Sequence, residues 1–377
     1  MASLMDTRRI GWLARLILLV LMVYAFLAAI ELFKNAIGMI GQGAADRLFG
    51  GLENPFAGLA VGILVTALMQ SSSVTTSMVV ALVGSGELEL QHAVPIVMGA
   101  NVGTSITCAL VSLGHITRRA EFRRAFAGAT AHDVFNLLSV AVLFPLELAT
   151  GYLRHGAQWL VRALPLQAVG GEFHSPVKTA VVWLARSIQA WVQRGLGLQE
   201  GVALAGVLAV LAAAMIVAAL VVITKNMRVL MADRIEQWLN RVLSRSGLLG
   251  LAIGAVITAA VQSSSITTSL LVPMFGSGVL TLEAGFPIML GANIGTTITA
   301  LLASTVTGPA GLTIALVHLL FNVSGTLIFF PLKPVRRIPI RLSEKLADLA
   351  VRNWIWIVVY VVGVFIVVPL AGILIWR

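Results

Sequence analysis

The stretch QSSSVTTSMVV at Gln70–Val80 returns almost unchanged as QSSSITTSLLV at Gln262–Val272, with eight of eleven residues identical. In each copy, seven of the first eight residues are polar, although apolar sequence lies on both sides. Such near-copies rarely arise by chance, so the pair indicates an internal duplication. An account of the fold must explain why a row of hydroxyl groups stands twice in apolar sequence.

Two further motif pairs follow the QSSS stretches in the same order. GANVGTSIT at Gly99–Thr107 matches GANIGTTIT at Gly291–Thr299 in seven of nine residues. HDVFN at His132–Asn136 then matches HLLFN at His318–Asn322. Three motif pairs in the same order indicate that the chain consists of two copies of one unit.

The composition is that of an integral membrane protein. Of the 377 residues, 58% are hydrophobic and 11% are charged, whereas soluble domains carry about 25% charged residues. The net charge of +10 sits between apolar runs, which favours membrane orientation over nucleic-acid binding. Several runs approach the ~20 residues that a spanning helix needs. They are Trp12–Phe33, Val94–Leu113, Ala125–Pro145, Val202–Ile223, Pro287–Thr305, Leu312–Leu332 and Trp354–Ile375.

The positions of the basic clusters predict how the chain crosses the membrane. They lie at Arg8, Arg9 and Arg15, at Arg118, Arg119, Arg123 and Arg124, across Lys225–Arg245, and across Lys333–Arg352. If all four clusters face the cytoplasm, the seven apolar runs cross in a fixed order from a cytoplasmic N-terminus. This order holds only if the two QSSS segments do not cross.

Short apolar arms support that condition. Phe56–Met69 and Leu248–Val261 are 14 residues each, which suits re-entrant hairpins better than full spans. The hairpins at 55–84 and 247–277 would then enter from opposite sides, as in the inverted repeats of secondary transporters. We therefore predict an all-α, inverted-repeat secondary transporter with two re-entrant QSSS hairpins and about seven full spans. The alternative is two ordinary pairs of polar helices.

This interpretation divides the chain into four parts. Residues 10–146 form the first inverted repeat, and residues 147–199 form an extracytoplasmic amphipathic linker. Residues 200–332 form the second repeat, which includes an interfacial helix at 225–245, and residues 333–377 form a basic loop and a C-terminal span. The amphipathic stretches are suited to the membrane interface; packing onto the protein's own core is the alternative.

A QSSS turn at the tip of a hairpin offers an anion site. Serine hydroxyls and the glutamine amide satisfy broken backbone at membrane depth. The half-helix that follows begins with free N–H groups and a positive dipole end. The structural alternative is Ser and Thr as polar contacts between helices. No Lys or Arg occurs at 48–117 or 246–332, so an anion bound there would need helix dipoles and co-bound cations.

The GANxGTxxT motifs offer oxygen ligands for such a cation. Two glycines are expected to break the span, and unwound carbonyls with nearby hydroxyls hold bare sodium in transporters. A close helix crossing through small residues is the alternative. The candidate ligands are Asn101, Thr104, Thr107, Asn293, Thr296 and Thr299.

Asp133 is an ionisable residue inside an apolar run, with Asn136 one turn further on. Charges within a span are functional candidates by default. The alternative is a partly solvated carboxylate near the inner end of the span. Its counterpart in the second copy is Leu319, so that copy cannot repeat a role that depends on this charge. His132 and His318 recur at matching positions, and we expect structural hydrogen bonds from them rather than a proton role.

The ordered set of motifs resembles the type II sodium–phosphate cotransporter family. The resemblance implies sodium-coupled phosphate import at a site between two inverted hairpins, with no cofactor and no enzymatic activity. It places the phosphate cradle at Gln70, Ser71, Ser72, Ser73, Gln262, Ser263, Ser264 and Ser265. It places sodium ligands at Thr76, Thr268, Thr296, Thr299 and Asn136, to which the repeat adds Asn322.

One sub-pattern resembles the electrogenic vertebrate members, which carry Ala, Ala and Asp where Ala127, Ala129 and Asp133 stand. It implies an additional sodium ion at Asp133. The chain departs from those members at Ala292, where they have Ser, and at Arg118, where they have an acidic residue. One sodium site is therefore in doubt. The chain also lacks their large glycosylated loop, which favours a bacterial inner-membrane protein.

Other readings stay open at this point. A phosphate exporter, or a carrier of another oxyanion, would use the same motifs. An intramembrane hydrolase would need a Ser paired with His132 or His318, and no such pairing follows from spacing. The expected partners are inorganic phosphate, sodium and the lipid bilayer, with no nucleic acid. The sequence leaves the oligomeric state open, a homodimer being one option.

Overall fold

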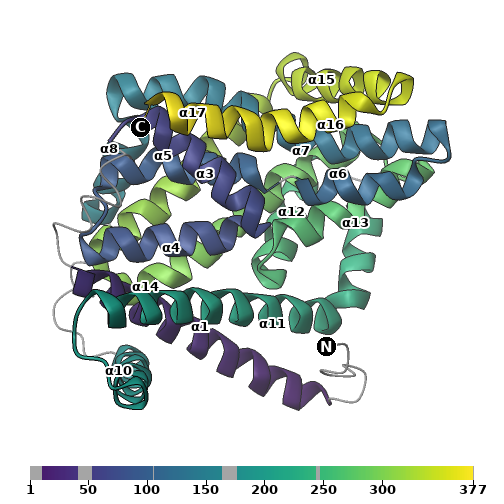
Figure 1. Cartoon of the computed structure of the whole chain (residues 1–377). Coiled ribbons are helices and arrows are strands. Elements are labelled where there is room, and N and C mark those ends of the chain that lie inside the picture. Colours follow the sequence, from purple (N-terminus) through teal and green to yellow (C-terminus); the bar gives the residue numbers. More distant parts are fainter. Residues whose placement is uncertain (1–10, 41–52, 105, 164–175, 243–246, 377) are drawn as a thin grey trace.

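The computed structural model describes residues 11–40, 53–104, 106–163, 176–242 and 247–376, and in these ranges all regular structure is helical. The prediction of an all-α protein is confirmed (Figure 1). The helices of the first half are α1 (Trp12–Ile40), α3 (Pro55–Met69), α4 (Ser72–Ser85), α5 (Leu90–Gly103), α6 (Ile106–Ser112), η2 (Leu113–His115), α7 (Arg119–Thr150) and α8 (Tyr152–Ala163). Those of the second half are α10 (Pro176–Leu196), α11 (Val202–Val242), α12 (Gly247–Val261), α13 (Ser264–Ser277), α14 (Leu282–Phe329), α15 (Lys333–Arg352), α16 (Ile355–Val362), η3 (Gly363–Val367) and α17 (Val368–Trp376).

Several helices are long and apolar enough to cross a membrane. Within the described residues there are five, at Leu13–Met39, Arg119–Thr150, Val202–Met227, Leu282–Phe329 and Ile355–Trp376. The fourth is 48 residues long, and Gly308 interrupts it with φ 78° and ψ −167°. It therefore contains two segments, which match the expected spans before and after this break. The expected span Val94–Leu113 is divided between α5 and α6. The protein is a multi-pass membrane protein, and the count of seven spans stays a prediction.

Each QSSS stretch forms a tight helical hairpin. Only two residues separate α3 from α4 and α12 from α13. The first of them, Gln70 or Gln262, has φ 54° or 58°, and these are the only described non-glycine residues with positive φ. The second, Ser71 or Ser263, caps the next helix by accepting a hydrogen bond from the N–H of Val74 or Ile266. A left-handed residue followed by a capping serine reverses the chain within two residues, which explains the hairpin shape.

Glycines let the first arm of each hairpin approach the next helix closely. A Cβ at Gly62 in α3 would lie 2.1 Å from the Ile96 carbonyl oxygen of α5. In the second copy, a Cβ at Gly254 in α12 would lie 2.0 Å from the Ile288 carbonyl oxygen of α14. Gly99 and Gly291 make the reciprocal approaches, so any side chain at these positions would separate the backbones.

The two repeats interlock through the second arms of the hairpins. α4 lies against α14, where a Cβ at Gly84 would meet the side chain of Thr307. α13 lies against α7, where a Cβ at Gly128 would meet the ring of Phe275. Each hairpin therefore packs on the helix that closes the other repeat. α1 and α11, the first helices of the two repeats, also run side by side (Figure 1).

Three boundaries differ from expectation. Residues expected to form a separate interfacial helix at 225–245 continue α11 without a break to Val242; positions 243–245 lie outside the described residues. The expected basic loop after position 333 is a helix, α15, which packs against α7. The linker at 147–199 contains the end of α7, then α8 and α10, while positions 164–175 lie outside the described residues. In α15 the buried residues recur at helical spacing on one face, so the charges on the other faces do not interrupt the helix.

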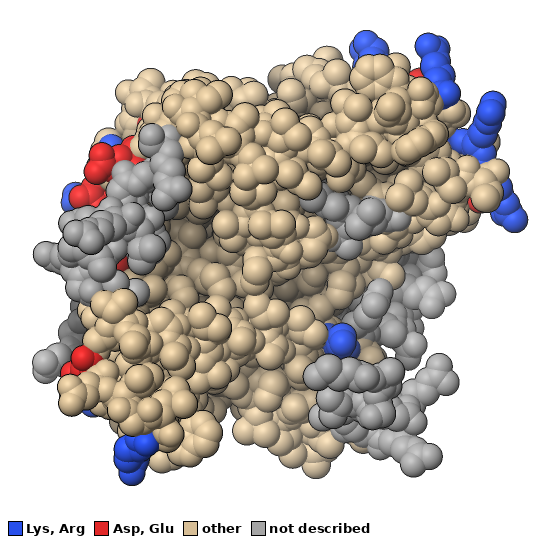
Figure 2. All heavy atoms as spheres, in the orientation of Figure 1, with Lys and Arg blue, Asp and Glu red and all other residues tan. Residues whose placement is uncertain are grey.

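Charges gather at the two ends of the molecule. Figure 2 shows Lys and Arg side chains over α15 and the adjoining end of α7, and acidic side chains mostly at the opposite end. The surface between is almost free of charge in this view. Large apolar side chains are exposed elsewhere on the protein's surface as well, for example Leu374 of α17, 82% exposed. This distribution matches a helical bundle crossing a bilayer.

Candidate functional site

The hairpin tips are built alike, and their glutamines fasten the turn. The side-chain amide of Gln70 donates to the carbonyl of Ala67, and that of Gln262 donates to the carbonyl of Ala259. Gln262 Oε1 also accepts a hydrogen bond of 2.7 Å from the Thr299 hydroxyl. This contact joins the QSSS tip to the GANxGTxxT segment of the same repeat.

Threonine hydroxyls hold the arms of each hairpin together. Thr66 donates to Thr75 across 2.9 Å, and Thr258 donates to Thr267 across 2.8 Å. The next threonine in each copy, Thr76 or Thr268, donates to the carbonyl four residues back at 2.8 Å. These hydrogen bonds therefore stiffen each tip. Thr76 and Thr268 lie one helical turn after Ser72 and Ser264, whose N–H groups begin the second arms.

The second and third serines provide the open donors of each tip. The first turn of a helix leaves its N–H groups without intrahelical acceptors. Because the first serine caps the N–H of Val74 or Ile266, the N–H groups of Ser72 and Ser73, and of Ser264 and Ser265, stay available to an anion. Ser265 is half-buried and the other three are buried.

A buried amide and imidazole network connects the two repeats at the centre. His132 Nε2 is hydrogen-bonded to Asn293 Oδ1, and His318 Nε2 lies 3.3 Å from Asn101 Oδ1. Asn293 donates to Asn136 Oδ1 at 2.6 Å, and Asn136 donates to the Asn101 carbonyl at 2.9 Å. The histidines thus form structural hydrogen bonds between repeats, as the sequence predicted.

The network is not symmetric. Asn322, the counterpart of Asn136, donates to the carbonyl of His318 on its own helix at 3.0 Å. Its Oδ1 is buried and has no hydrogen-bond partner among the described residues, and the same holds for the hydroxyls of Ser77 and Ser139. Buried oxygens without donors suit a cation that takes oxygen ligands. The described residues contain no cluster of His, Cys, Asp and Glu for a softer metal.

The GANxGTxxT motif in the second repeat does not break its helix. α14 runs through Gly291 and Gly295 without interruption as far as Gly308, so the expected unwinding at these glycines is wrong. The glycines serve a close helix crossing instead. The hydroxyls of Thr104 and Thr296 donate to carbonyls one turn back, at 3.1 and 2.9 Å. In this conformation neither hydroxyl is held by the other repeat.

Asp133 is fully buried, which excludes the partly solvated alternative. The hydroxyl of Tyr360, in α16, donates to Asp133 Oδ2 at 2.9 Å. In the same repeat, the sulfur of Cys108 lies 3.0 Å from the Thr268 hydroxyl and 3.7 Å from that of Ser269. The first repeat therefore contacts the hairpin of the second repeat through a polar side chain.

Sequence reasoning missed Tyr360 and undervalued Cys108. Tyr360 lies outside both repeats, so no internal counterpart identified it. Cys108 is buried as expected, yet it has polar contacts. A comparison of the two repeats could have drawn attention to Cys108, because the equivalent residue, Ala300, has no polar side-chain atom.

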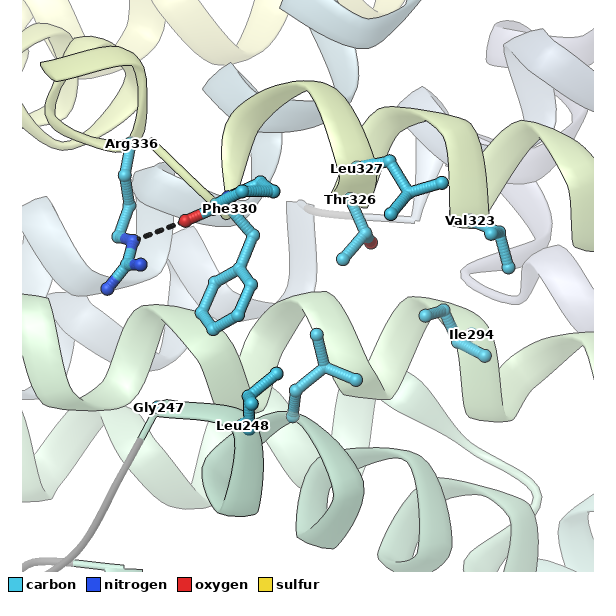
Figure 3. A pocket seen from close by; sticks show the side chains of 10 residues that line it. Gly247, Leu248, Ile294, Val323, Thr326, Leu327, Phe330 and Arg336 are labelled. Carbon is cyan, nitrogen blue, oxygen red and sulfur yellow. Dashed lines mark hydrogen bonds between the residues drawn. The ribbon is translucent and has the colours of Figure 1, made fainter. Parts of the chain in front are cut away.

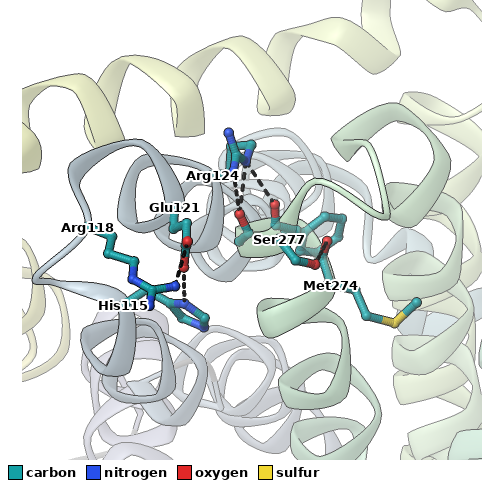
Figure 4. Close-up of polar contacts among 8 residues, drawn as sticks. His115, Arg118, Glu121, Arg124, Met274 and Ser277 are labelled. Carbon is teal, nitrogen blue, oxygen red and sulfur yellow. Dashed lines mark hydrogen bonds and ion pairs between the residues drawn. The ribbon is translucent and has the colours of Figure 1, made fainter.

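Arg124 fastens the far end of the second hairpin. Its guanidinium donates to the carbonyls of Phe275 and Gly276, at 3.3 and 2.6 Å, where α13 ends (Figure 4). A cation at a helix C-terminus also complements the helix dipole. Arg118 lies at the surface with its side chain 74% exposed and pairs with Glu121 at 3.0 Å. In this conformation Arg118 pairs at the surface rather than entering the polar core.

A family model described as Na+/Pi-cotransporter matches residues 25–154 and 215–342. The chain belongs to this family. The matched segments contain both hairpins, both GANxGTxxT motifs and Asp133, so the resemblance found in the motifs is confirmed. They leave out Tyr360.

Individual members of the Na+/Pi-cotransporter family are similar over most of this chain. It is 32% identical to sodium-dependent phosphate transport protein 2B of Homo sapiens over 446 residues, covering 95% of this chain and 64% of the relative. It is 34% identical to protein 2A of Rattus norvegicus, covering 92% and 65%, and 34% identical to protein 2A of Ovis aries, covering 96% and 68%. The chain thus spans about two thirds of their length. No solved structure gives a significant match.

Proposed function

We propose that this chain is a secondary transporter that imports inorganic phosphate together with sodium by alternating access. The observation that carries the proposal is the pair of hairpin tips, whose free N–H groups lie within stretches that contain no Lys or Arg. An anion held there has dipoles and hydroxyls for partners, and the stretches that carry the tips contribute no Lys or Arg as a counter-charge. Sodium bound at the neighbouring oxygens supplies that charge, which couples the two ions.

Phosphate binds, in this proposal, between the tips. Ser72, Ser73, Ser264 and Ser265 offer backbone N–H groups, while Ser71 and Ser263 fix the turns. Gln70 and Gln262 adopt the left-handed backbone conformation that ends the preceding helix and begins the turn. Charge-assisted hydrogen bonds from preorganised donors are about twice as strong as neutral ones, which suits an oxyanion.

Sodium binds at the buried oxygens beside the tips. The hydroxyls of the second repeat lie closest to a tip, because Thr299 contacts Gln262 and Thr268 stands one turn after Ser264. Buried amide oxygens complete the candidate set. Its members are Thr76, Asn101, Thr104, Asn136, Thr268, Asn293, Thr296, Thr299 and Asn322.

Asp133 takes an additional sodium ion, so that each cycle moves net positive charge inward. A buried carboxylate is costly unless a cation neutralises it. Tyr360 supplies one hydrogen bond but no charge. A sodium ion at Asp133 therefore makes transport electrogenic.

Membrane placement follows the same proposal. The two hairpins are re-entrant from opposite sides, the N-terminus and the basic end face the cytoplasm, and the protein lies in a bacterial inner membrane, where it can form a homodimer. The Lys and Arg side chains over α15, and the nearly uncharged surface between the two charged ends, support this orientation.

Uptake of labelled phosphate into proteoliposomes tests the proposal. An inward sodium gradient should drive accumulation, and replacement of sodium by potassium should abolish it. Uptake that is independent of sodium would sink the proposal, whereas outward movement under physiological gradients would favour the exporter. Competition by arsenate or sulfate would show whether the protein carries another oxyanion in place of phosphate.

A hydrolase is disfavoured by the contacts of the two histidines. Among the described residues, His132 and His318 are hydrogen-bonded to asparagines of the opposite repeat. Activation of a serine nucleophile requires a base within hydrogen-bond reach. A single Ser→Ala change in a QSSS stretch should accordingly reduce phosphate affinity only in part, whereas the loss of a nucleophile would abolish activity.

A further inference from the structure

An apolar groove lies between α12 and the end of α14, at the basic end of the molecule. It has a volume of about 620 Å³. Figure 3 shows Leu248 on one wall and Ile294, Val323 and Leu327 along its length, with Phe330 and Arg336 at one end. Leu248 and Leu327 are 68% and 65% exposed, so the groove opens onto the outer surface of the bundle.

Among the described residues that line this groove, Arg336 alone is charged, and its position is fixed. Its Nε donates to the Phe330 carbonyl at 2.8 Å, and its Cζ lies 4.3 Å from the centre of the Phe330 ring. The carbonyl binds only Nε, which leaves the two terminal nitrogens to bind another acceptor.

The surroundings of Arg336 are also basic. Lys333, Arg337 and Arg341 lie exposed on the same helix. α15 has two acidic residues, Glu344 and Asp348, and neither lines the groove. Arg123 pairs with Asp348 at 2.5 Å and holds the pKa of that carboxyl below its usual range. The end of the groove therefore presents an excess of positive charge beside an apolar channel.

We propose that this groove binds an anionic phospholipid. One acyl chain lies between α12 and α14, and the lipid phosphate takes a charge-assisted hydrogen bond from the terminal nitrogens of Arg336. The apolar walls fit a hydrocarbon chain and the guanidinium fits a phosphate. A free phosphate ion would leave the walls unfilled. The exposed cations nearby add attraction for an anionic leaflet.

The bound lipid would tie the first arm of the second hairpin to the last helix of its repeat. α12 begins at Gly247, where an added Cβ would lie 3.2 Å from the Phe330 ring, so the groove and the start of the hairpin share one contact. This inference goes beyond the transport proposal and does not depend on the ion that the hairpins bind.

Native mass spectrometry of the full chain tests the lipid site. The protein is extracted from vesicles with equal amounts of phosphatidylglycerol and phosphatidylcholine, and retained lipid is counted. Both lipids carry a phosphate, but the choline cation of phosphatidylcholine would be repelled by Arg336 and the exposed cations beside it, so wild type should retain phosphatidylglycerol in preference, by about tenfold. Arg336→Gln should lose the preference, and Leu327→Trp, which fills the groove, should lose the bound lipid.

Matched controls separate this site from general effects. Arg341→Gln removes an exposed cation on the same helix and should keep most of the preference, because Arg341 does not line the groove. Leu374→Trp adds an indole at an 82% exposed leucine elsewhere and should behave as wild type. If Arg336→Gln does not fold, Arg336→Lys provides the same reading, because it keeps the charge but loses the fork geometry and should weaken the preference. Equal retention of phosphatidylglycerol by wild type and the Arg336 variant, or its displacement by millimolar inorganic phosphate, would overturn the proposal.

Discussion

The two hairpins share one local structure but stand in different surroundings. Their turns, caps and threonine contacts agree closely, as the φ angles of 54° and 58° at Gln70 and Gln262 illustrate. Around the second hairpin, however, Cys108 contacts Thr268, and the other repeat has Ala300 at the equivalent position. The buried Asp133 has Leu319 as its counterpart. Duplication thus explains the shared turns and caps, and divergence leaves the buried carboxylate to one repeat.

The largest expected effect comes from breaking what the hairpins share. Gly62→Val and Gly254→Val should each destabilise the fold by about 3 kcal/mol or more, because the new side chain would displace a backbone carbonyl. Thermal unfolding and yield of monodisperse protein measure this. Gly206→Val is the control, since no atom lies within 4 Å of a Cβ there. Wild-type stability in either hairpin variant would contradict the close crossing.

The second effect concerns the charge found on one side only. Asp133→Gly should leave sodium-driven phosphate uptake but abolish the accompanying current, because the additional sodium loses its carboxylate. Voltage-dependent uptake in proteoliposomes measures this. Leu319→Gly introduces the same glycine at the matching position of the other repeat and should keep the current. Unchanged charge movement in the Asp133 variant would refute the role of that residue.

Tyr360→Phe should have a smaller effect at the same carboxylate. Losing one hydrogen bond to a carboxylate costs about 1.5 kcal/mol, so the sodium concentration for half-maximal uptake should rise roughly tenfold. The phosphate dependence at saturating sodium should stay the same. Tyr24→Phe removes a hydroxyl that donates to the Ala180 carbonyl and serves as the matched control. A parallel loss of phosphate affinity would point to a general structural role.

The smallest effect is expected from making the two repeats more alike. Cys108→Ala copies Ala300 and removes only a weak thiol contact with Thr268. Uptake rate and sodium dependence should stay within about twofold, because a thiol is a weak hydrogen-bond partner. A loss of transport current like that expected for Asp133→Gly would show that the thiol, and not only the carboxylate, distinguishes the two repeats.

The sequence predicted those features that repeat or follow local rules. The paired QSSS motifs placed both hairpins, and the paired histidines predicted structural hydrogen bonds. Sequence could not predict that α14 stays helical through Gly291 and Gly295, since a close crossing and an unwound turn both require glycine. Tyr360 reaches Asp133 only through tertiary packing, more than 200 positions away, and no motif marks it. Likewise, α15 was expected to be a loop because its charges and prolines hid an amphipathic face that packs on α7.

The central claim is that the hairpin tips hold phosphate only with the help of sodium. Equilibrium binding of labelled phosphate to the purified protein, at increasing sodium and constant ionic strength, tests it most directly. Affinity should rise steeply with sodium and be nearly absent in potassium, because no Lys or Arg stands in the stretches that carry the tips. Equal phosphate affinity in sodium and potassium would contradict the claim.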